Sequence, residues 1–234
     1  MDPNAGSGDY GSCCAEMNVW EANSISAAYT AHPCGTASQT RCSRADCSSS
    51  RLCDADGCDF NPYRMGNTTL FGAGSIVNTA SKMTVVTQFI TDSGKSSGSL
   101  KEIRRVYIQN GQVIQNSKVN IPGIPNSYNS ISAAYCSDQK RVFGDKDSFG
   151  ERGGLASISK AMSAGMVLSI SLLGDSETNM YWLDSLYPTN GDPSSPGVAR
   201  GICPNYVGPT LPVEPGVNPT VAFSNIRVGD TSVY

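Results

Sequence analysis

Two glutamates, Glu16 and Glu21, lie five positions apart near the start of the chain, with the amide of Asn18 and the indole of Trp20 between them. Charged residues make up only 16% of the sequence, so two neighbouring carboxyl groups stand out. Cleavage of a glycosidic bond needs two carboxyl groups, because one protonates the leaving oxygen and the other attacks the anomeric carbon or activates water. The first hypothesis is therefore a carbohydrate-cleaving enzyme.

A strand through these residues would place Glu16 and Asn18 on one face, because side chains alternate with a period of two. Glu21 has the opposite parity and would face away, unless the strand carries a bulge. Bulges are common beside active sites, so we predict one between Asn18 and Glu21. The carboxyl groups would then lie about 5–5.5 Å apart, the separation of a retaining mechanism. Two solvated strand glutamates are the alternative, which the spacing alone leaves open.

Composition indicates a secreted, loop-rich β protein. The 24 glycines and 13 prolines favour an all-β fold, and nine cysteines indicate disulfides and an oxidising compartment. The sequon at Asn67 agrees with secretion. A net charge of -3 without a basic stripe argues against a nucleic-acid partner. No apolar run is long enough to span a bilayer, so we expect no membrane association.

The cysteine count is odd, so at least one cysteine is unpaired within this chain or pairs outside it. A zinc site is the competing use for four of them: Cys42, Cys47, Cys53 and Cys58. The secreted composition disfavours that use. Residues 1–8 lack the basic start and apolar core of a signal peptide, which favours a mature form or a fragment. Two-carboxylate chemistry needs no metal or organic cofactor, so none is expected.

Hydrophobic and turn patterns predict an antiparallel sandwich with long loops. Strands are predicted at residues 83–90, 103–109, 112–115, 166–172 and 220–228. The sequence Asn110-Gly111 favours a tight hairpin turn between the second and third of them. One short helix is expected within residues 154–164. Residues 34–58 form a cysteine-stapled loop region, and residues 204–219 a proline-rich extended tail.

The segment GSCCAEMNVWEANSIS, residues 11–26, resembles the signature of glycoside hydrolase family 7, the fungal-type cellobiohydrolases and endoglucanases. Other segments resemble family segments in the same order, at residues 30–34, 53–64, 84–89, 180–185 and 223–226. The resemblance implies a concanavalin-like, antiparallel β-jelly-roll sandwich whose concave face binds cellulose or cello-oligosaccharides. It also implies that residues 1–234 are the C-terminal part of a single catalytic domain, and so an incomplete sandwich.

The resemblance assigns roles around the two carboxyl groups. It implies that Glu16 is the nucleophile, that Glu21 is the general acid/base, and that His32 supports the site. Asn18 stands where the family usually has an aspartate that hydrogen-bonds the nucleophile. Losing that negative charge should ease ionisation of the nucleophile, although it could lower the rate by disturbing orientation. The implied reaction is hydrolysis of β-1,4-glucosidic bonds with retention, by a secreted, extracellular enzyme.

Two segments, residues 143–150 and 187–200, resemble loops that enclose the cleft in cellobiohydrolases, and so imply release of cellobiose from reducing chain ends. The segment after Cys47 is shorter than in some tunnel-forming enzymes of the family, which implies a tunnel more open than theirs. Substrate-binding positions implied by the resemblance are Arg51, Asp56, Asp59, Arg64, Trp182, Tyr187 and Arg200. Ordinary surface charge is the alternative for the arginines, and ordinary core packing is the alternative for Trp182. Leu172-Leu173 stands where the family often has Trp, so one stacking platform is expected to be lost.

The resemblance also implies a disulfide pattern: Cys34 with Cys53, Cys42 with Cys47, and Cys58 with Cys136. Cys13, Cys14 and Cys203 would then pair with cysteines of the N-terminal half of the domain. Without that half, a sandwich exposes an apolar face and open strand edges. We therefore expect the chain alone to be poorly stable and at most weakly active. A non-catalytic carbohydrate-binding sandwich, or an inactive fragment, is the alternative function.

Overall fold

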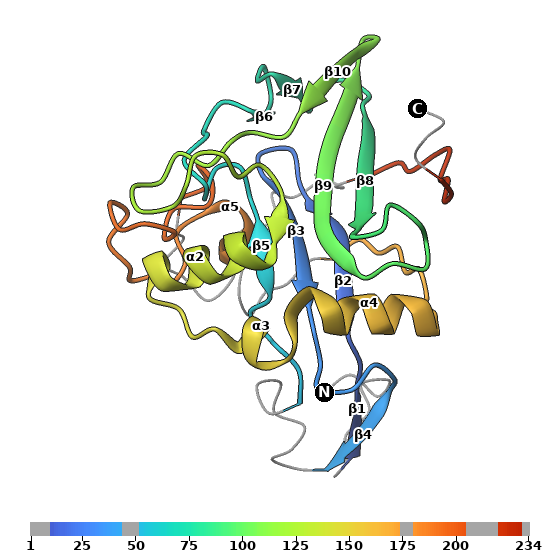
Figure 1. The fold of residues 1–234 in the computed structure, drawn as a ribbon. Coiled ribbons are helices and arrows are strands. Elements are labelled where there is room, and N and C mark those ends of the chain that lie inside the picture. Colours follow the sequence, from blue (N-terminus) through green and yellow to red (C-terminus); the bar gives the residue numbers. More distant parts are fainter. Residues whose placement is uncertain (1–9, 44–51, 174–179, 205–219, 231–234) are drawn as a thin grey trace.

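The computed structural model describes residues 10–43, 52–173, 180–204 and 220–230 (Figure 1). The strands are β1 Tyr10–Cys13, β2 Glu16–Ala22, β3 Ala27–His32, β4 Thr40–Ser43, β5 Cys58–Phe60, β6 Phe71–Gly72, β7 Val77–Asn78, β8 Thr84–Thr91, β9 Leu100–Gln109, β10 Gln112–Gln115 and β11 Ile131–Ser132. The helices are α2 Ala133–Phe143, α3 Ser148–Glu151, α4 Gly154–Ala164 and α5 Tyr181–Asp184. No described helix is long and apolar enough to cross a membrane.

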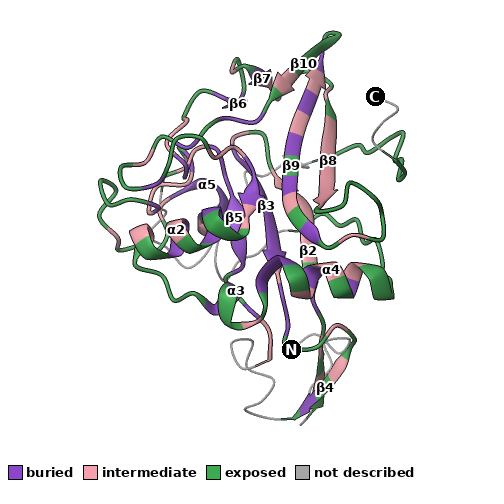
Figure 2. Ribbon diagram, in the orientation of Figure 1, coloured by how far each residue is buried: buried purple, intermediate pink, exposed green. Residues whose placement is uncertain are grey.

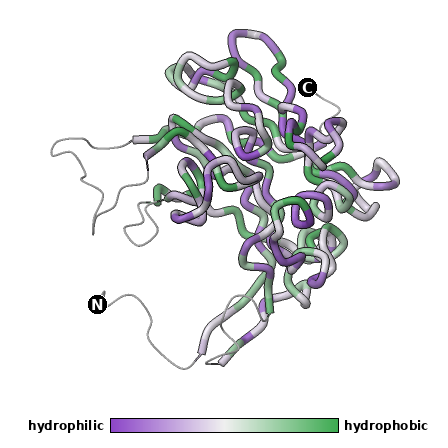
Figure 3. Tube along the Cα trace, turned by 90° about the vertical axis from the view of Figure 1, so that its left-hand side faces the viewer, coloured by the Kyte–Doolittle hydropathy of each residue, from purple (hydrophilic) through white to green (hydrophobic). Residues whose placement is uncertain are grey.

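Two antiparallel sheets supply most of the fold. In one, β9 pairs with β8, β10 and β11, and in the other the order is β2-β3-β5. The main core draws on both sheets and is closed by α2 and α4. Its fully buried side chains include Tyr29, Phe60, Ile103, Tyr135 and Ile158. Figure 2 shows β3 and β5 buried, and Figures 1 and 3 show the β1-β4 pair projecting from the body.

Several local predictions are confirmed. β8 covers the strand expected at residues 83–90, and β9 and β10 form the predicted hairpin. Asn110 and Gly111 both have positive φ, 52° and 75°, which is the geometry that a two-residue hairpin turn requires. α4 spans the whole predicted helix. These elements depend on contacts close in sequence, which is why pattern alone finds them.

The sequence patterns do not predict α2, which is as long as α4. Its boundaries carry the usual signals. The Ser132 hydroxyl accepts a hydrogen bond from the Tyr135 amide (3.2 Å), and Gly144 ends the helix with φ 72°.

The prediction of strands at residues 166–172 and 220–228 is wrong. Both segments lack regular secondary structure and are exposed in the described chain. Val167 and Val228 are each 95% exposed, and Leu172 and Leu173 are 62% and 64% exposed. A strand is held by the hydrogen-bond ladder to a neighbour, so alternating apolar residues cannot form one alone.

These apolar side chains predict self-association. Replacing both Val167 and Leu173 with Lys should reduce binding of a hydrophobic dye and light scattering at high concentration, because large exposed apolar patches drive association. The free energy of unfolding should change by only about 0.5 kcal/mol, since both side chains lie on the surface. The matched control is Val113→Lys at an exposed position of β10. Equal dye binding by the control and the double variant would contradict the prediction.

The disulfide pattern is confirmed where it is described. Cys34 pairs with Cys53 and Cys58 with Cys136, while Cys13, Cys14 and Cys203 are free thiols. The predicted partner of Cys42, Cys47, lies outside the described residues. All but the first residue of the predicted proline-rich tail, residues 204–219, also lies outside them. No group of His, Cys, Asp and Glu in the described ranges could hold a metal ion. Cys53 and Cys58, two members of the alternative zinc set, are instead joined in disulfides.

Candidate active site

The pairing of β2 with β3 contains the predicted bulge. Asn18 pairs with Thr30, and Glu21 pairs with Ala28. Val19 and Trp20 of β2 therefore lie opposite a single residue of β3, Tyr29. This extra residue reverses the alternation of β2. It brings Glu21 to the face that carries Asn18, and the Asn18 amide donates a hydrogen bond to Glu21 Oε1 (3.2 Å).

The second oxygen of Glu21 is held by the neighbouring strand. The Thr30 hydroxyl donates to Glu21 Oε2 at 2.6 Å, so both carboxyl oxygens accept a hydrogen bond from β2 or β3. Thr30 is nearly buried, with 5% of its surface exposed. The carboxyl group therefore has a fixed orientation.

Burial controls the protonation of Glu21. Loss of solvent raises the pKa of this carboxyl group above its ordinary value, and the charges of Asp59 and Glu16 act in the same direction. The Thr30 hydrogen bond opposes the rise without cancelling it. A carboxyl group in this state keeps its proton to a higher pH than usual, as a general acid requires.

Thr30→Val gives a pH-dependent test of this environment. The hydroxyl stabilises the carboxylate, so its loss should raise the Glu21 pKa further. Activity that needs protonated Glu21 disappears as pH rises through that pKa, so the alkaline fall in kcat/KM should move to higher pH. A pH-rate profile measures the shift, with Thr87→Val on the other sheet as the control. An unmoved alkaline limb in Thr30→Val would exclude Glu21 as its source.

His32 is held in one orientation by two contacts. Its Nδ1 lies 3.0 Å from the Asp54 carbonyl oxygen, and its Nε2 lies 3.3 Å from the Asn18 amide nitrogen. Because a carbonyl can only accept, Nδ1 carries the proton, and the neutral ring accepts from Asn18 at Nε2. Gly57 packs against this ring with φ +70°, and a Cβ there would lie 2.6 Å from His32 Cε1. Only glycine fits beside the imidazole.

Glu16 begins β2 and is exposed to solvent, directly opposite His32 in the strand register. Its parity places it on the face of Asn18, as predicted. The two carboxyl groups therefore occupy one strand in different environments, Glu16 in solvent and Glu21 largely buried.

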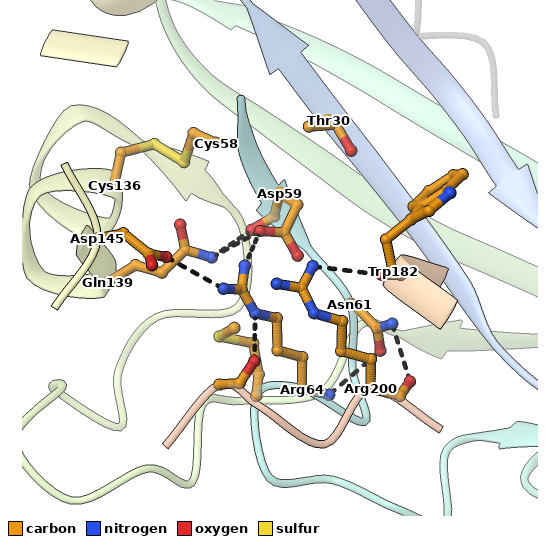
Figure 4. Close-up of polar contacts among 12 residues, drawn as sticks. Thr30, Cys58, Asp59, Asn61, Arg64, Cys136, Gln139, Asp145, Trp182 and Arg200 are labelled. Carbon is orange, nitrogen blue, oxygen red and sulfur yellow. Dashed lines mark hydrogen bonds and ion pairs between the residues drawn. A yellow bond between two sulfur atoms is a disulfide. The ribbon is translucent and has the colours of Figure 1, made fainter. Parts of the chain in front are cut away.

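A second cluster surrounds the buried pair of Asp59 and Arg64 (Figure 4). Arg64 also donates to the Gly197 carbonyl (3.0 Å) and to Asp145 (3.2 Å), and Gln139 donates to Asp59 (3.1 Å). Burial alone would raise the pKa of Asp59, but its cationic neighbours outweigh burial and hold that pKa below its ordinary value. The lowered pKa favours the carboxylate form of Asp59 within this cluster.

Arg200 connects this cluster to Trp182 and Tyr187. Its Nη1 donates to the Trp182 carbonyl (3.2 Å), and its guanidinium lies 5.1 Å from the centre of the Tyr187 ring. Burial lowers the pKa of Arg200 to about 10, helped by the charge of Arg64 and opposed chiefly by Asp59. The side chain remains a cation at neutral pH, beside an aromatic ring that is 42% exposed.

A family model described as glycosyl hydrolase family 7 matches residues 1–234. The chain belongs to glycosyl hydrolase family 7. The antiparallel sheets are accordingly those of the family 7 jelly-roll sandwich.

Solved family 7 structures resemble this chain closely. A cellobiohydrolase from Daphnia pulex is 48% identical with a TM-score of 0.82, over 87% of this chain and 47% of that one. A Melanocarpus albomyces cellobiohydrolase, complexed with cellotetraose, is 40% identical with a TM-score of 0.77, over 87% and 46%. A Humicola insolens endocellulase is 35% identical with a TM-score of 0.69, over 75% and 42%. The chain thus spans about half the length of these family 7 enzymes.

The structure gathers most of the predicted family 7 site residues. Glu16, Asn18, Glu21 and His32 lie on β2 and β3. The second cluster collects Asp59, Arg64, Trp182, Tyr187 and Arg200. Asp56 is exposed, and Arg51 lies outside the described residues.

Sequence reasoning missed several residues that build these clusters, among them Thr30 and Asn61. Thr30 could have been predicted, because once the bulge is placed the pairing of β2 with β3 puts Thr30 opposite Asn18. Asn61 could not have been predicted, because its amide donates to the carbonyls of Leu183 and Arg200, which are far away in sequence. No local pattern signals such a contact.

Proposed function

We propose that this chain carries the catalytic strand of a retaining cellulase that hydrolyses β-1,4-glucosidic bonds. Glu16 is the nucleophile and Glu21 the general acid/base. The observation that carries this proposal is the contrast between the two carboxyl groups on β2. Glu16 is exposed, whereas burial raises the pKa of Glu21 and two donors orient it. Carboxyl groups in contrasting environments are the means by which one site holds both an acid and a nucleophile.

The reaction follows from these positions. Protonated Glu21 gives its proton to the leaving glycosidic oxygen while Glu16 attacks the anomeric carbon, and a covalent glycosyl-enzyme forms. Glu21, now a carboxylate, removes a proton from water, which attacks the anomeric carbon and releases Glu16. Two displacements retain the anomeric configuration. Asn18 and Thr30 keep the Glu21 carboxyl group oriented through both steps.

The exo type is supported by the two loop segments. Arg64 binds Asp145 in residues 143–150 and Gly197 in residues 187–200, so one buried side chain fixes both. Identity is also higher to the two cellobiohydrolases than to the endocellulase, 48% and 40% against 35%. We therefore propose release of cellobiose from reducing chain ends, with Trp182, Tyr187, Arg200, Arg51 and Asp56 contacting the product sugars.

We further propose that a polypeptide corresponding to the other half of a family 7 domain completes the sandwich. The exposed alternating segments at residues 166–173 and 220–228 and the three free thiols support this partner. The disulfides and the family support an extracellular location.

Product analysis tests the function. The chain is incubated with a soluble cello-oligosaccharide, alone and together with the N-terminal half of a family 7 relative. Products are separated by chromatography, and the first-formed anomer is read by NMR. We expect predominantly cellobiose, formed first as the β-anomer. Binding without cleavage in both preparations would instead support a non-catalytic carbohydrate-binding sandwich.

A further inference from the structure

Arg105 is a cation buried where charge is costly. It lies on β9 with 2% of its surface exposed. Its Nε and Nη1 have no hydrogen-bond partner within the described chain. A buried charge without a matching anion destabilises a fold, so its presence calls for a compensating role.

The contacts of Arg105 converge on the bulge of β2, although the residue comes from the other sheet. Its Nη2 donates to the Val19 carbonyl. Its guanidinium lies 5.2 Å from the centre of the Trp20 ring and 4.7 Å from that of Tyr29. Val19 and Trp20 are the two bulged residues, and Tyr29 is the single residue that they face. One side chain therefore contacts every residue of the bulge.

The bulge decides where Glu21 points. Without the additional residue, β2 would alternate regularly and Glu21 would leave the face of Asn18. Bulges interrupt the strand ladder locally, so the ladder alone holds them less firmly than regular pairing. A planar guanidinium suits this place, because it can stack on aromatic faces and donate to a carbonyl in its own plane.

We propose that Arg105 is a positioning residue, which locks the bulge of β2 and thereby holds Glu21 toward Asn18. It acts through Val19, Trp20 and Tyr29 and does not touch the substrate. The inference rests on the proposed role of Glu21 as the acid/base.

The test replaces Arg105 with Met, which fills the space between the rings without donating, and with Lys, which keeps the charge but loses the planar fork. Arg104→Met is the matched control, since the neighbouring Arg104 is half exposed and pairs with Glu102 at 2.7 Å. Folding is checked by thermal unfolding. The titration of Glu21 is then followed by carbon-13 NMR of its carboxyl group in the full chain. The groups that tune Glu21, namely Thr30, His32, Asp59 and Glu16, are unchanged in all variants.

We expect the Glu21 pKa to fall toward its ordinary value in both Arg105 variants, because a relaxed bulge exposes the carboxyl group. The NMR signals of the Asn18 side-chain amide should move as well, and Arg104→Met should leave both readouts unchanged. A change in Arg105→Lys identifies position rather than charge as the cause. Where turnover is measurable, kcat should fall about 100-fold with little change in KM, as for a displacement of about 1 Å.

Folded variants with the unchanged titration of Glu21 would overturn the proposal. Failure of both variants to fold would also overturn it, because Arg105 would then serve stability rather than positioning. The titration needs no turnover, so a chain that lacks cellulase activity still tests this inference separately from the proposed function.

Discussion

Replacing Glu16 with Gln is expected to lower kcat/KM on a soluble cello-oligosaccharide by about 1,000-fold or more, because an amide cannot form the glycosyl-enzyme. The exposed position of Glu16 at the start of β2 makes a structural cause for such a loss implausible. The free energy of unfolding should therefore change by only about 0.5 kcal/mol, as for other surface substitutions. Chromatography of the products measures the first effect and urea denaturation the second.

The control for this variant is Glu151→Gln. Glu151 is an exposed carboxylate on α3 that pairs with Lys146 at 3.1 Å, so its loss should affect neither activity nor stability appreciably. Both variants are compared in whichever preparation turns over, the chain alone or the chain with the complementary half. Residual turnover by Glu16→Gln near that of the control would remove Glu16 from the mechanism.

Replacing Glu21 with Gln should produce a loss that depends on the leaving group. On cellotetraose the rate should fall by about 100- to 10,000-fold, the usual contribution of a general acid. On an aryl cellobioside with a dinitrophenolate leaving group, the first step needs no proton. Burst kinetics should therefore show that the glycosyl-enzyme forms at a nearly unchanged rate and then accumulates.

A small anion such as azide should relieve this accumulation, because it attacks the glycosyl-enzyme without a general base. The product would be a β-glycosyl azide, detectable by mass spectrometry and NMR. Glu16→Gln is the internal comparison. Its rate should fall equally on both substrates, and azide should not restore it. Equal loss on both substrates in Glu21→Gln would contradict the assignment of Glu21 as the acid.

The features predicted correctly from the sequence are those decided within a few residues. The bulge follows from the parity of Glu16, Asn18 and Glu21, and the β9-β10 turn from Asn110 and Gly111. Family resemblance added two disulfides that spacing alone left open, between residues 19 and 78 positions apart.

The failures concern partners distant in sequence. Residues 166–172 have the apolar alternation of a strand, but a ladder needs a neighbour, which the described chain does not provide. The contacts of Asn61 with Leu183 and of Arg105 with Val19 span 122 and 86 positions. Nothing in the local sequence around an asparagine or an arginine shows which distant carbonyl it will meet.

The contact between His32 and Asn18 also sets the number of protons that these two side chains must carry for their hydrogen bond to form. With Nδ1 committed to the Asp54 carbonyl, the neutral imidazole offers only a lone pair to position 18, and the asparagine amide supplies the hydrogen. An aspartate there has no hydrogen to give, so the same contact would require one further proton, on the ring or on the carboxylate. In this chain the contact beside Glu21 forms without uptake of a proton, whereas in Asn18→Asp its formation would depend on pH.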